Sequence, residues 1–259
     1  MSAGPGAAAG PLHVETVGAA VVITVDRPAT RNAIDGATAQ GIAAAIARAS
    51  ADPAIRGVVL AATGATYLSG GDLNLLAALV DDAHGAEAIL ALGVELAAIE
   101  QIPLPVIAAV SGDVFGGGCE IVLLCDLVIV EEQAAFAFRH AKMGLSPAWG
   151  GMTRLVERVG PIEAARLLYT AEKVDALEAV RLGLANEVVT RGAARTRALA
   201  RVARIAENPR DSVAALKRTL SEVRAAHRGA AIEREREAFA ARWGSDDHRA
   251  AIRAFEARK

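Results

Sequence analysis

Glu120 is the residue whose surroundings point most directly to chemistry. It follows three consecutive glycines in the stretch FGGGCEIVLLCDLVIV, residues 115–130, where the only other charged residue is Asp126. An ionised carboxylate taken out of water costs several kcal/mol unless something compensates it. We therefore expect Glu120 either to turn to solvent or to lie in a functional site.

Two glycine turns could supply hydrogen-bond donors to such a site. They are YLSGGDLNLL, residues 67–76, and VFGGGCE, residues 114–120, and each follows an apolar strand and opens a helix. Glycine lets a ligand approach the backbone, and a helix N-terminus has free N–H groups. One such turn is ordinary, but two that converge could place two N–H donors on one oxygen as an oxyanion hole. Neither turn has a nucleotide-phosphate pattern.

The elements that must position these residues alternate between strand and helix. Short apolar runs predict buried parallel strands, and the longer alanine-rich runs between them predict crossover helices. After Ser146 and Pro147 the pattern is helical nearly to the end of the chain. The expected strands are 19–26, 57–62, 105–112, 126–132 and 134–138, and the expected helices before Ser146 include 35–52 and 85–102.

The chain divides into three parts by composition. Residues 1–10 are expected to be a disordered leader, because MSAGPGAAAG has neither a basic start nor a true apolar core. Residues 11–192 form the α/β core. Residues 193–259 are rich in Arg, Glu and Ala at helical spacing and are too charged to be a core. We expect this last region to pack on the core or on another subunit.

Bulk composition excludes several classes of protein. Hydrophobic residues make up 53% of the 259 residues but aromatic residues only 3%, so the core must be aliphatic. A net charge of −2 argues against nucleic acid or an anionic membrane as the main partner. No apolar run is long enough for a membrane span. The spacing of Cys119 and Cys125 is typical of neither a metal nor a redox site, which indicates reduced, buried thiols in a cytoplasmic protein.

Four motifs together resemble the crotonase superfamily, also called the enoyl-CoA hydratase/isomerase family. The resemblance implies a ββα spiral core, a C-terminal helical trimerisation region, and a homotrimer or a dimer of trimers. It also implies an acyl-CoA thioester as substrate, with no separate cofactor and no metal. The motifs are VDRPATRNAID (25–35), YLSGGDL (67–73), PVIAAVSGDVFGGGCEIVLLCD (105–126) and MGLSPAWGG (143–151).

The resemblance also implies roles for individual residues. The N–H groups of Gly71 and Gly117 would hold the thioester oxygen while an enolate forms. Glu120 would be an acid/base residue, because an apolar pocket favours the neutral carboxyl and suits proton exchange near neutral pH; alternatively, the backbone satisfies it at the helix start. Trp149 would line the acyl pocket or simply belong to the core, and Arg31 would contact coenzyme A or be solvated. The full set of implied substrate-binding residues is Ser69, Gly70, Asp72, Leu73, Gly116, Trp149 and Arg31.

One position departs from the hydratase pattern. Hydratases of this family have a second glutamate in a segment like F-x-x-P-E, whereas this chain has FAFRHAKMGLSP with His140 at that position. His140 could instead be an ordinary core or surface histidine. The phrases SGGDLN, residues 69–74, and FRHAKMGLSPAWGGMTRLVERVG, residues 138–160, are similar to the ethylmalonyl-CoA/methylmalonyl-CoA decarboxylase branch, which also has a histidine there.

The expected function is therefore decarboxylation of a short branched malonyl-CoA. The oxyanion hole would hold the enolate, and Glu120 or His140 would protonate it; His140 could alternatively bind the leaving carboxylate. An enoyl-CoA hydratase or isomerase that uses Glu120 is the first alternative. A non-catalytic member of the fold that binds acyl-CoA is the second.

Overall fold

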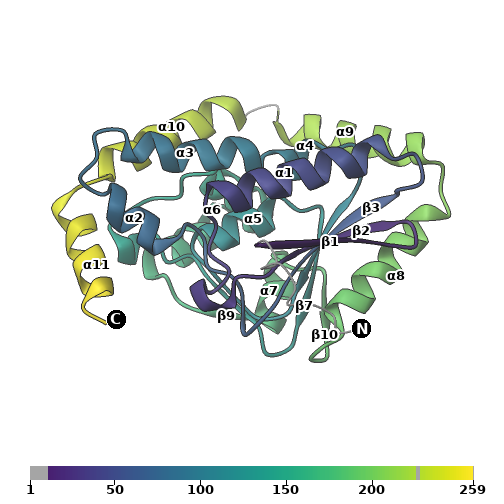
Figure 1. Ribbon diagram of the computed structural model, residues 1–259, viewed down its shortest axis with the longest axis horizontal. Helices are drawn as coiled ribbons and strands as arrows, with labels where there is room; N and C mark the ends of the chain where they lie inside the picture. The colour runs from purple at the N-terminus through teal and green to yellow at the C-terminus, as the bar shows by residue number, and fades with distance from the viewer. Residues whose placement is uncertain (1–10, 226–227, 259) are drawn as a thin grey trace, which may run out of the picture.

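The structure, a computed structural model, describes residues 11–225 and 228–258. The expected leader, residues 1–10, lies outside the described residues. The described chain contains two β-sheets, and helices cover both faces of the larger one (Figure 1).

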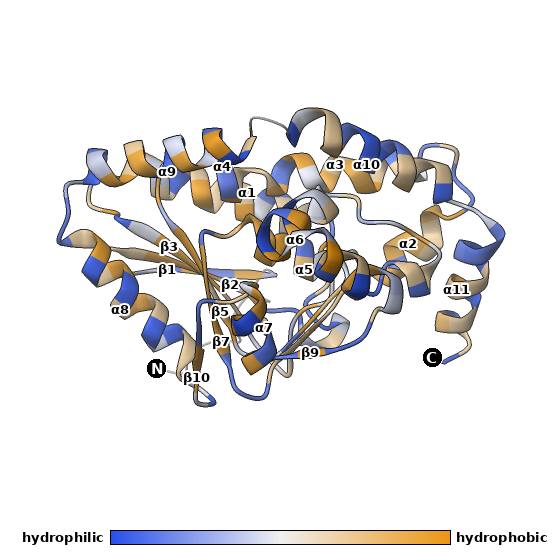
Figure 2. Cartoon of the chain, turned by 180° about the vertical axis from the view of Figure 1, so that it is seen from behind, coloured by the Kyte–Doolittle hydropathy of each residue, from blue (hydrophilic) through white to orange (hydrophobic). Residues whose placement is uncertain are grey.

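The larger sheet has six strands in the order β1-β2-β3-β5-β7-β10. β1 and β2 form an antiparallel hairpin, and every later neighbour is parallel, as the strand–helix alternation predicts. The central strands are buried on both faces and are mostly hydrophobic (Figure 2). The strands are β1 (Leu12–Val17), β2 (Ala20–Val25), β3 (Gly57–Ala62), β5 (Val106–Val110), β7 (Leu127–Glu131) and β10 (Glu187–Val189).

The smaller sheet gives the chain its ββα repeat. Each long central strand is followed by a short strand of the second sheet and then by a helix, and the repeats wind as the expected spiral. β4, β6 and β8 are parallel, and β9 closes the sheet antiparallel to β8. The short strands are β4 (Thr66–Leu68), β6 (Asp113–Phe115), β8 (Ala135–Ala137) and β9 (Val174–Asp175).

Two apolar layers hold the helices against the larger sheet. On one face, buried side chains of β3, β5 and β7 pack against α8. The other face packs against α1, α3 and α5 in the main core. The helices are η1 (Pro28–Thr30), α1 (Gly36–Ala51), α2 (Leu73–Leu79), α3 (Gly85–Leu96), α4 (Ala98–Gln101), α5 (Gly117–Leu124), η2 (Ala141–Met143), α6 (Gly151–Thr170), α7 (Ala176–Leu182), α8 (Ala194–Ala206), α9 (Arg210–Ala225), α10 (Arg228–Arg242) and α11 (Asp246–Glu256).

The region after Pro147 is less uniformly helical than the sequence predicts. β10 extends the large sheet beside β7, and β9 closes the small one, so this part of the prediction is wrong. Both strands have only two or three residues, which is too short for a period to show in the sequence. Residues 12–17 form β1, a strand that was not expected from the sequence.

The C-terminal helices pack on their own core. α10 lies on α6 and α3, and α11 lies across η2 and α2 (Figure 1). The expectation that this region is highly charged holds, but several of its charged side chains are buried. They are Lys217, Arg228 and Glu235, and the polar ring of His248 is buried as well. Of the helices in the described ranges, none is long and apolar enough to cross a bilayer.

Lys217 connects α9 to the core through a buried ion pair. Its side chain is 6% exposed and that of Asp126 is 20% exposed, and the Lys217 Nζ lies 2.7 Å from Oδ2 of Asp126, the residue before β7. The same Nζ donates to the Leu104 carbonyl at 2.9 Å. Removing one partner of a buried pair leaves an uncompensated charge, which is more costly than the pair itself is favourable.

We predict that Lys217→Met lowers the free energy of unfolding by about 2–4 kcal/mol, because Asp126 keeps its charge and loses its cation. Urea denaturation monitored by circular dichroism measures this. Arg218→Met is the matched control, because Arg218 is exposed on the same helix, and it should change stability by less than about 0.5 kcal/mol. Equal midpoints for the two variants would contradict the prediction.

Candidate active site

The two glycine turns meet in space. β4 leads into the first turn, where Gly70 has φ +90°, and β6 leads into the second, where Gly116 has φ +51°. A Cβ atom added to Gly70 would lie 2.7 Å from the Gly117 nitrogen. Glycine is therefore required at Gly70 both for its left-handed backbone and for its contact with the second turn.

The N–H groups of Gly71 and Gly117 are oriented to serve as donors. Ile34 donates to the Gly70 carbonyl at 2.7 Å and accepts from the Asp72 N–H at 3.1 Å. Because N–H groups alternate along an extended backbone, the Gly71 N–H points away from Ile34. Gly117 opens α5, where the first N–H groups have no partner in the helix. In the part of the chain that the structure describes, neither N–H has a backbone acceptor.

A polar network that the sequence analysis did not assign supports the first turn. Arg27 forms ion pairs with Asp35 at 2.8 Å and with Asp72 at 3.2 Å. Asn32 is fully buried and donates to the carbonyls of Thr63 and Thr66, at 2.6 and 2.8 Å. Arg27 and Asn32 both lie in the motif VDRPATRNAID, from which only Arg31 was singled out.

The other expected substrate-binding residues of the first turn have different surroundings. Asp72 is 6% exposed, and its carboxylate caps α2 and pairs with Arg27. Ser69 Oγ lies 3.5 Å from the Thr30 carbonyl. Leu73 opens α2 and packs against the main core. Arg31 is exposed on the adjoining loop, with a left-handed φ of 57°.

Glu120 lies one helical turn after Gly117 and is 2% exposed. Side chains on a helix lean toward its N-terminus, so this carboxylate lies beside the second glycine turn. Its surroundings are polar, not apolar as the sequence analysis expected. Oε2 accepts from the N–H groups of Trp149 and Gly151, at 2.7 and 2.9 Å, and Oε1 accepts from Ala148 at 3.2 Å.

His140 supplies the fourth contact to this carboxylate. Its Nε2 lies 3.0 Å from Glu120 Oε1, and the two side chains are 10% and 2% exposed. The structure therefore brings together the two residues that the sequence analysis selected for acid/base chemistry. The other ring nitrogen, Nδ1, is buried and has no hydrogen-bond partner among the described residues.

Trp149 links Glu120 to the second glycine turn. Its backbone N–H binds Glu120, and its indole N–H donates to the Ile89 carbonyl of α3 at 2.9 Å. The ring lies against Gly117, because a Cβ atom added there would be 2.6 Å from Trp149 Cζ3. Trp149 is 7% exposed, so it belongs to the core and also borders the site.

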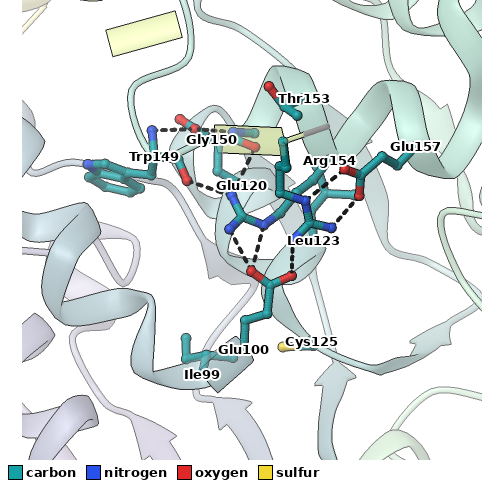
Figure 3. Close-up of polar contacts among 12 residues, drawn as sticks. Ile99, Glu100, Glu120, Leu123, Cys125, Trp149, Gly150, Thr153, Arg154 and Glu157 are labelled. Atoms are coloured by element: carbon teal, nitrogen blue, oxygen red, sulfur yellow. Dashed lines mark hydrogen bonds and ion pairs between the residues drawn. The ribbon is translucent and has the colours of Figure 1, made fainter. Parts of the chain in front are cut away.

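A buried ionic network contacts the segment that precedes α6 (Figure 3). Arg154 donates from Nη1 to the carbonyls of Trp149 and Gly150, both at 3.1 Å, and binds Glu100 through Nη2 at 2.6 Å. Burial alone would raise the pKa of Glu100. Hydrogen bonds and positive charge from Arg154 and then Arg228 outweigh burial and lower this pKa below its ordinary value.

Three other features of the described residues do not indicate a second active site. A hollow of about 550 Å³ is lined by residues of the η2–α6 segment and α11 together with Arg242, and neither glycine turn lines it. Within residues 11–225 and 228–258, no group of His, Cys, Asp and Glu side chains could hold a metal ion. Cys119 and Cys125 are free and buried, as expected, and burial raises the pKa of Cys125 to about 12.

Comparison with known proteins agrees with this architecture. The family model for enoyl-CoA hydratase/isomerase matches residues 15–259. The chain is 37% identical over 170 residues to the crotonyl-CoA hydratase of Syntrophomonas wolfei, and this match spans 65% of each protein. It is 30% identical over 200 residues to the ethylmalonyl-CoA decarboxylase of Rattus norvegicus, covering 76% of this chain and 67% of the relative.

A solved structure extends the likeness to nearly the whole fold. The enoyl-CoA hydratase of Bacillus halodurans superimposes with a TM-score of 0.87 at 25% identity, covering 94% of this chain and 99% of that one. The family model and the shared fold together cover both glycine turns, Glu120 and His140. The chain therefore belongs to the enoyl-CoA hydratase/isomerase family.

Proposed function

We propose that the protein acts on an acyl-CoA thioester and removes CO₂ from a short branched malonyl thioester, such as methylmalonyl- or ethylmalonyl-CoA. The observation that carries this proposal is the asymmetry of the Glu120–His140 pair. A carboxylate has about four acceptor positions, and Glu120 has four contacts within the chain. His140 Nδ1 has none among the described residues.

The two residues then have different roles. Glu120 is the orienting partner: it fixes the His140 ring through Nε2 and balances the charge of the imidazolium, as the carboxylate does in a carboxylate–histidine pair. His140 is the proton donor, through Nδ1. The sequence analysis left Glu120 and His140 as alternative donors, and the filled coordination of Glu120 favours His140.

The reaction needs few groups. The bond between the α-carbon and the substrate carboxylate breaks, CO₂ leaves, and the electron pair forms the thioester enolate. The N–H groups of Gly71 and Gly117 stabilise the negative oxygen of the enolate. The α-carbon then takes the proton from His140 Nδ1, which gives the acyl-CoA product. No residue has to remove a proton from the α-carbon in these steps.

Hydration of an enoyl-CoA is the second candidate, and the similarity to crotonyl-CoA hydratase favours it. As noted above, hydratases of this family have a glutamate at the position of His140. The similarity to ethylmalonyl-CoA decarboxylase supports the first candidate. Assays of both reactions on the same protein decide between them.

The proposed assembly is a homotrimer or a dimer of trimers. Leu216, Leu220 and Val223 follow one face of α9 and are 65%, 61% and 70% exposed. In the described part of the chain this apolar stripe is left largely exposed, and contact with a second copy would bury it. Figure 2 shows the hydrophobic segments on α9.

The first prediction concerns the reaction. Wild type should decarboxylate methylmalonyl- or ethylmalonyl-CoA faster than it hydrates crotonyl-CoA, as followed by chromatography of the thioesters. His140→Gln should lower kcat of decarboxylation about 10²- to 10⁴-fold, because it removes the proton donor. His140→Glu should lower it at least about tenfold, because a second carboxylate repels that of the substrate.

The matched control is His84→Gln, which changes an exposed histidine at the start of α3 and should leave kcat unchanged. Efficient hydration of crotonyl-CoA without loss of CO₂ from either malonyl thioester would establish the second candidate instead. Binding of these thioesters without turnover would indicate a non-catalytic member of the family.

The second prediction concerns the oxyanion hole. Gly71→Pro removes the proposed donor, and loss of one such donor costs roughly 10²–10³ in kcat. Gly71→Ala keeps the N–H, and its Cβ would meet only Leu76 Cδ1, at 3.0 Å. If folded Gly71→Pro turned over within about fivefold of Gly71→Ala, the donor would be wrongly assigned.

The third prediction concerns assembly. Leu216→Asn with Leu220→Asn should shift sedimentation from the trimer toward the monomer, because burying each leucine contributes about 1.5–3 kcal/mol. Arg218→Gln, at an exposed position of the same helix, should not change the sedimentation coefficient. A wild type that sediments as a monomer at micromolar concentration would exclude this assembly.

A further inference from the structure

Two buried carboxylates share the start of α6. The Gly151 N–H donates to Glu120, whereas the next two N–H groups, of Met152 and Thr153, donate to Glu235 on α10, both at 3.1 Å. The Thr153 hydroxyl also contacts Glu235, at 3.1 Å. The N-cap residue of α6 is Gly150, which has no side chain to cap the helix. The two glutamates therefore satisfy N–H groups that would otherwise have no partner.

This arrangement places like charges close together in the interior. Glu235 is 0% exposed and Glu120 is 2% exposed. Burial and then the negative charge of Glu120 raise the pKa of Glu235 above its ordinary value. A serine or an asparagine would cap the same helix without this repulsion. The second carboxylate therefore has a cost that capping alone does not explain.

α10 also contacts the carbonyl side of the same segment. Arg228 lies two helical turns before Glu235 and binds Glu100 at 2.6 Å. Glu100 in turn binds Arg154, which donates to the Trp149 and Gly150 carbonyls. One helix thus fixes the amides of residues 152–153 directly and the carbonyls of residues 149–150 through two ion pairs. Of the amides that bind Glu120, that of Gly151 lies between these two attachments, and those of Ala148 and Trp149 come directly before them.

We propose that Glu235 is a positioning residue for the Glu120–His140 pair, which it serves in two ways. It fixes the segment whose amides hold Glu120, and its negative charge increases the proton affinity of the pair. This proposal rests on the proposed role of His140 as proton donor. It assigns to the C-terminal region a part in the chemistry in addition to packing.

Other charged groups around Glu235 are engaged elsewhere or exposed. Arg154 on α6 is turned to Glu100, and Arg228 on α10 is turned to Glu100 and Glu157. α3 carries two glutamates, both exposed, and α10 itself carries charged neighbours of Glu235 that are exposed or partly exposed. These remaining groups are Glu87, Glu95, Glu233, Arg234, Arg236 and Glu237, with Glu222 and Arg224 at the end of α9.

The test is an NMR titration of the His140 ring in protein labelled with ¹³C-histidine, with His140→Gln to assign the signal. Glu235→Gln removes the charge and retains the size of the side chain. Losing a nearby negative charge disfavours the protonated imidazole, so the midpoint of the His140 titration should fall by roughly 0.5–1 pH unit. Glu237→Gln removes an exposed charge from the same helix and should move the midpoint by less than about 0.2 unit.

If Glu235→Gln does not fold, Thr153→Val replaces it, because it removes one hydrogen bond that stabilises the Glu235 anion. The midpoint should then fall in the same direction by a smaller amount. The proposal is overturned if the folded variant has the same His140 midpoint as wild type. It is also overturned if His140 titrates in neither protein. The titration does not require turnover. If the midpoint shifts but wild type fails to decarboxylate, the proposed reaction is refuted and the role of Glu235 stands.

Discussion

The hydrogen bonds from the amides of Ala148, Trp149 and Gly151 to the carboxylate of Glu120 form the interaction on which the rest of the site depends. A carboxylate this deep in the protein costs several kcal/mol unless donors replace the lost water. The chain supplies them by folding the segment after η2 back over α5, so that α6 begins where the carboxylate lies. That path brings the Trp149 ring against Gly117, and His140, just before η2, contacts the same carboxylate. The positions of the segment before α6 and of the His140 ring are therefore tied to satisfying one buried charge.

The scaffold separates the two tasks of the site. The glycine turns follow strands of the small sheet, and their contact is fixed by the parallel pairing of β4 with β6 and by the bridge between Ile34 and Gly71. These are backbone constraints, and they orient N–H groups with little dependence on side chains. In the proposed reaction, proton transfer relies instead on side chains from α5 and from the segment before η2. The segment before α6 connects the two, because the Trp149 amide binds Glu120 while its ring lies against Gly117.

Much of this could be predicted from the sequence, because the informative patterns are local. The hydrophobic patterns of strands and helices predicted the central strands and α1, and the glycines that follow two strands predicted both turns. The choice of Glu120 and of His140 as candidate acid/base residues followed from family resemblance, whereas the contact between them is seen only in the structure. Glu235 could not be found in this way: in EREREAF it has the pattern of a solvated helix face, and its partners Met152 and Thr153 are more than eighty residues away. The support from Arg27 and Asn32 was missed for the same reason, since it depends on contacts with Asp72, Thr63 and Thr66, which are distant in the sequence. β10 was missed because it is too short for a period to show.

The two glutamates at the start of α6 also give a physical reason for the histidine at position 140. With Glu120 and Glu235 both buried there, a third carboxylate would add another negative charge around one helix N-terminus, whose dipole offsets only about half a unit. A histidine contributes no negative charge, and when protonated it offsets one of the two already present. The departure from the hydratase pattern is thus consistent with the electrostatics of the surrounding fold as well as with the chemistry proposed for the substrate. The negative charge of Glu235 on α10 is therefore expected to disfavour a carboxylate at position 140. This effect acts through space, because no direct contact joins Glu235 to His140 in the structure.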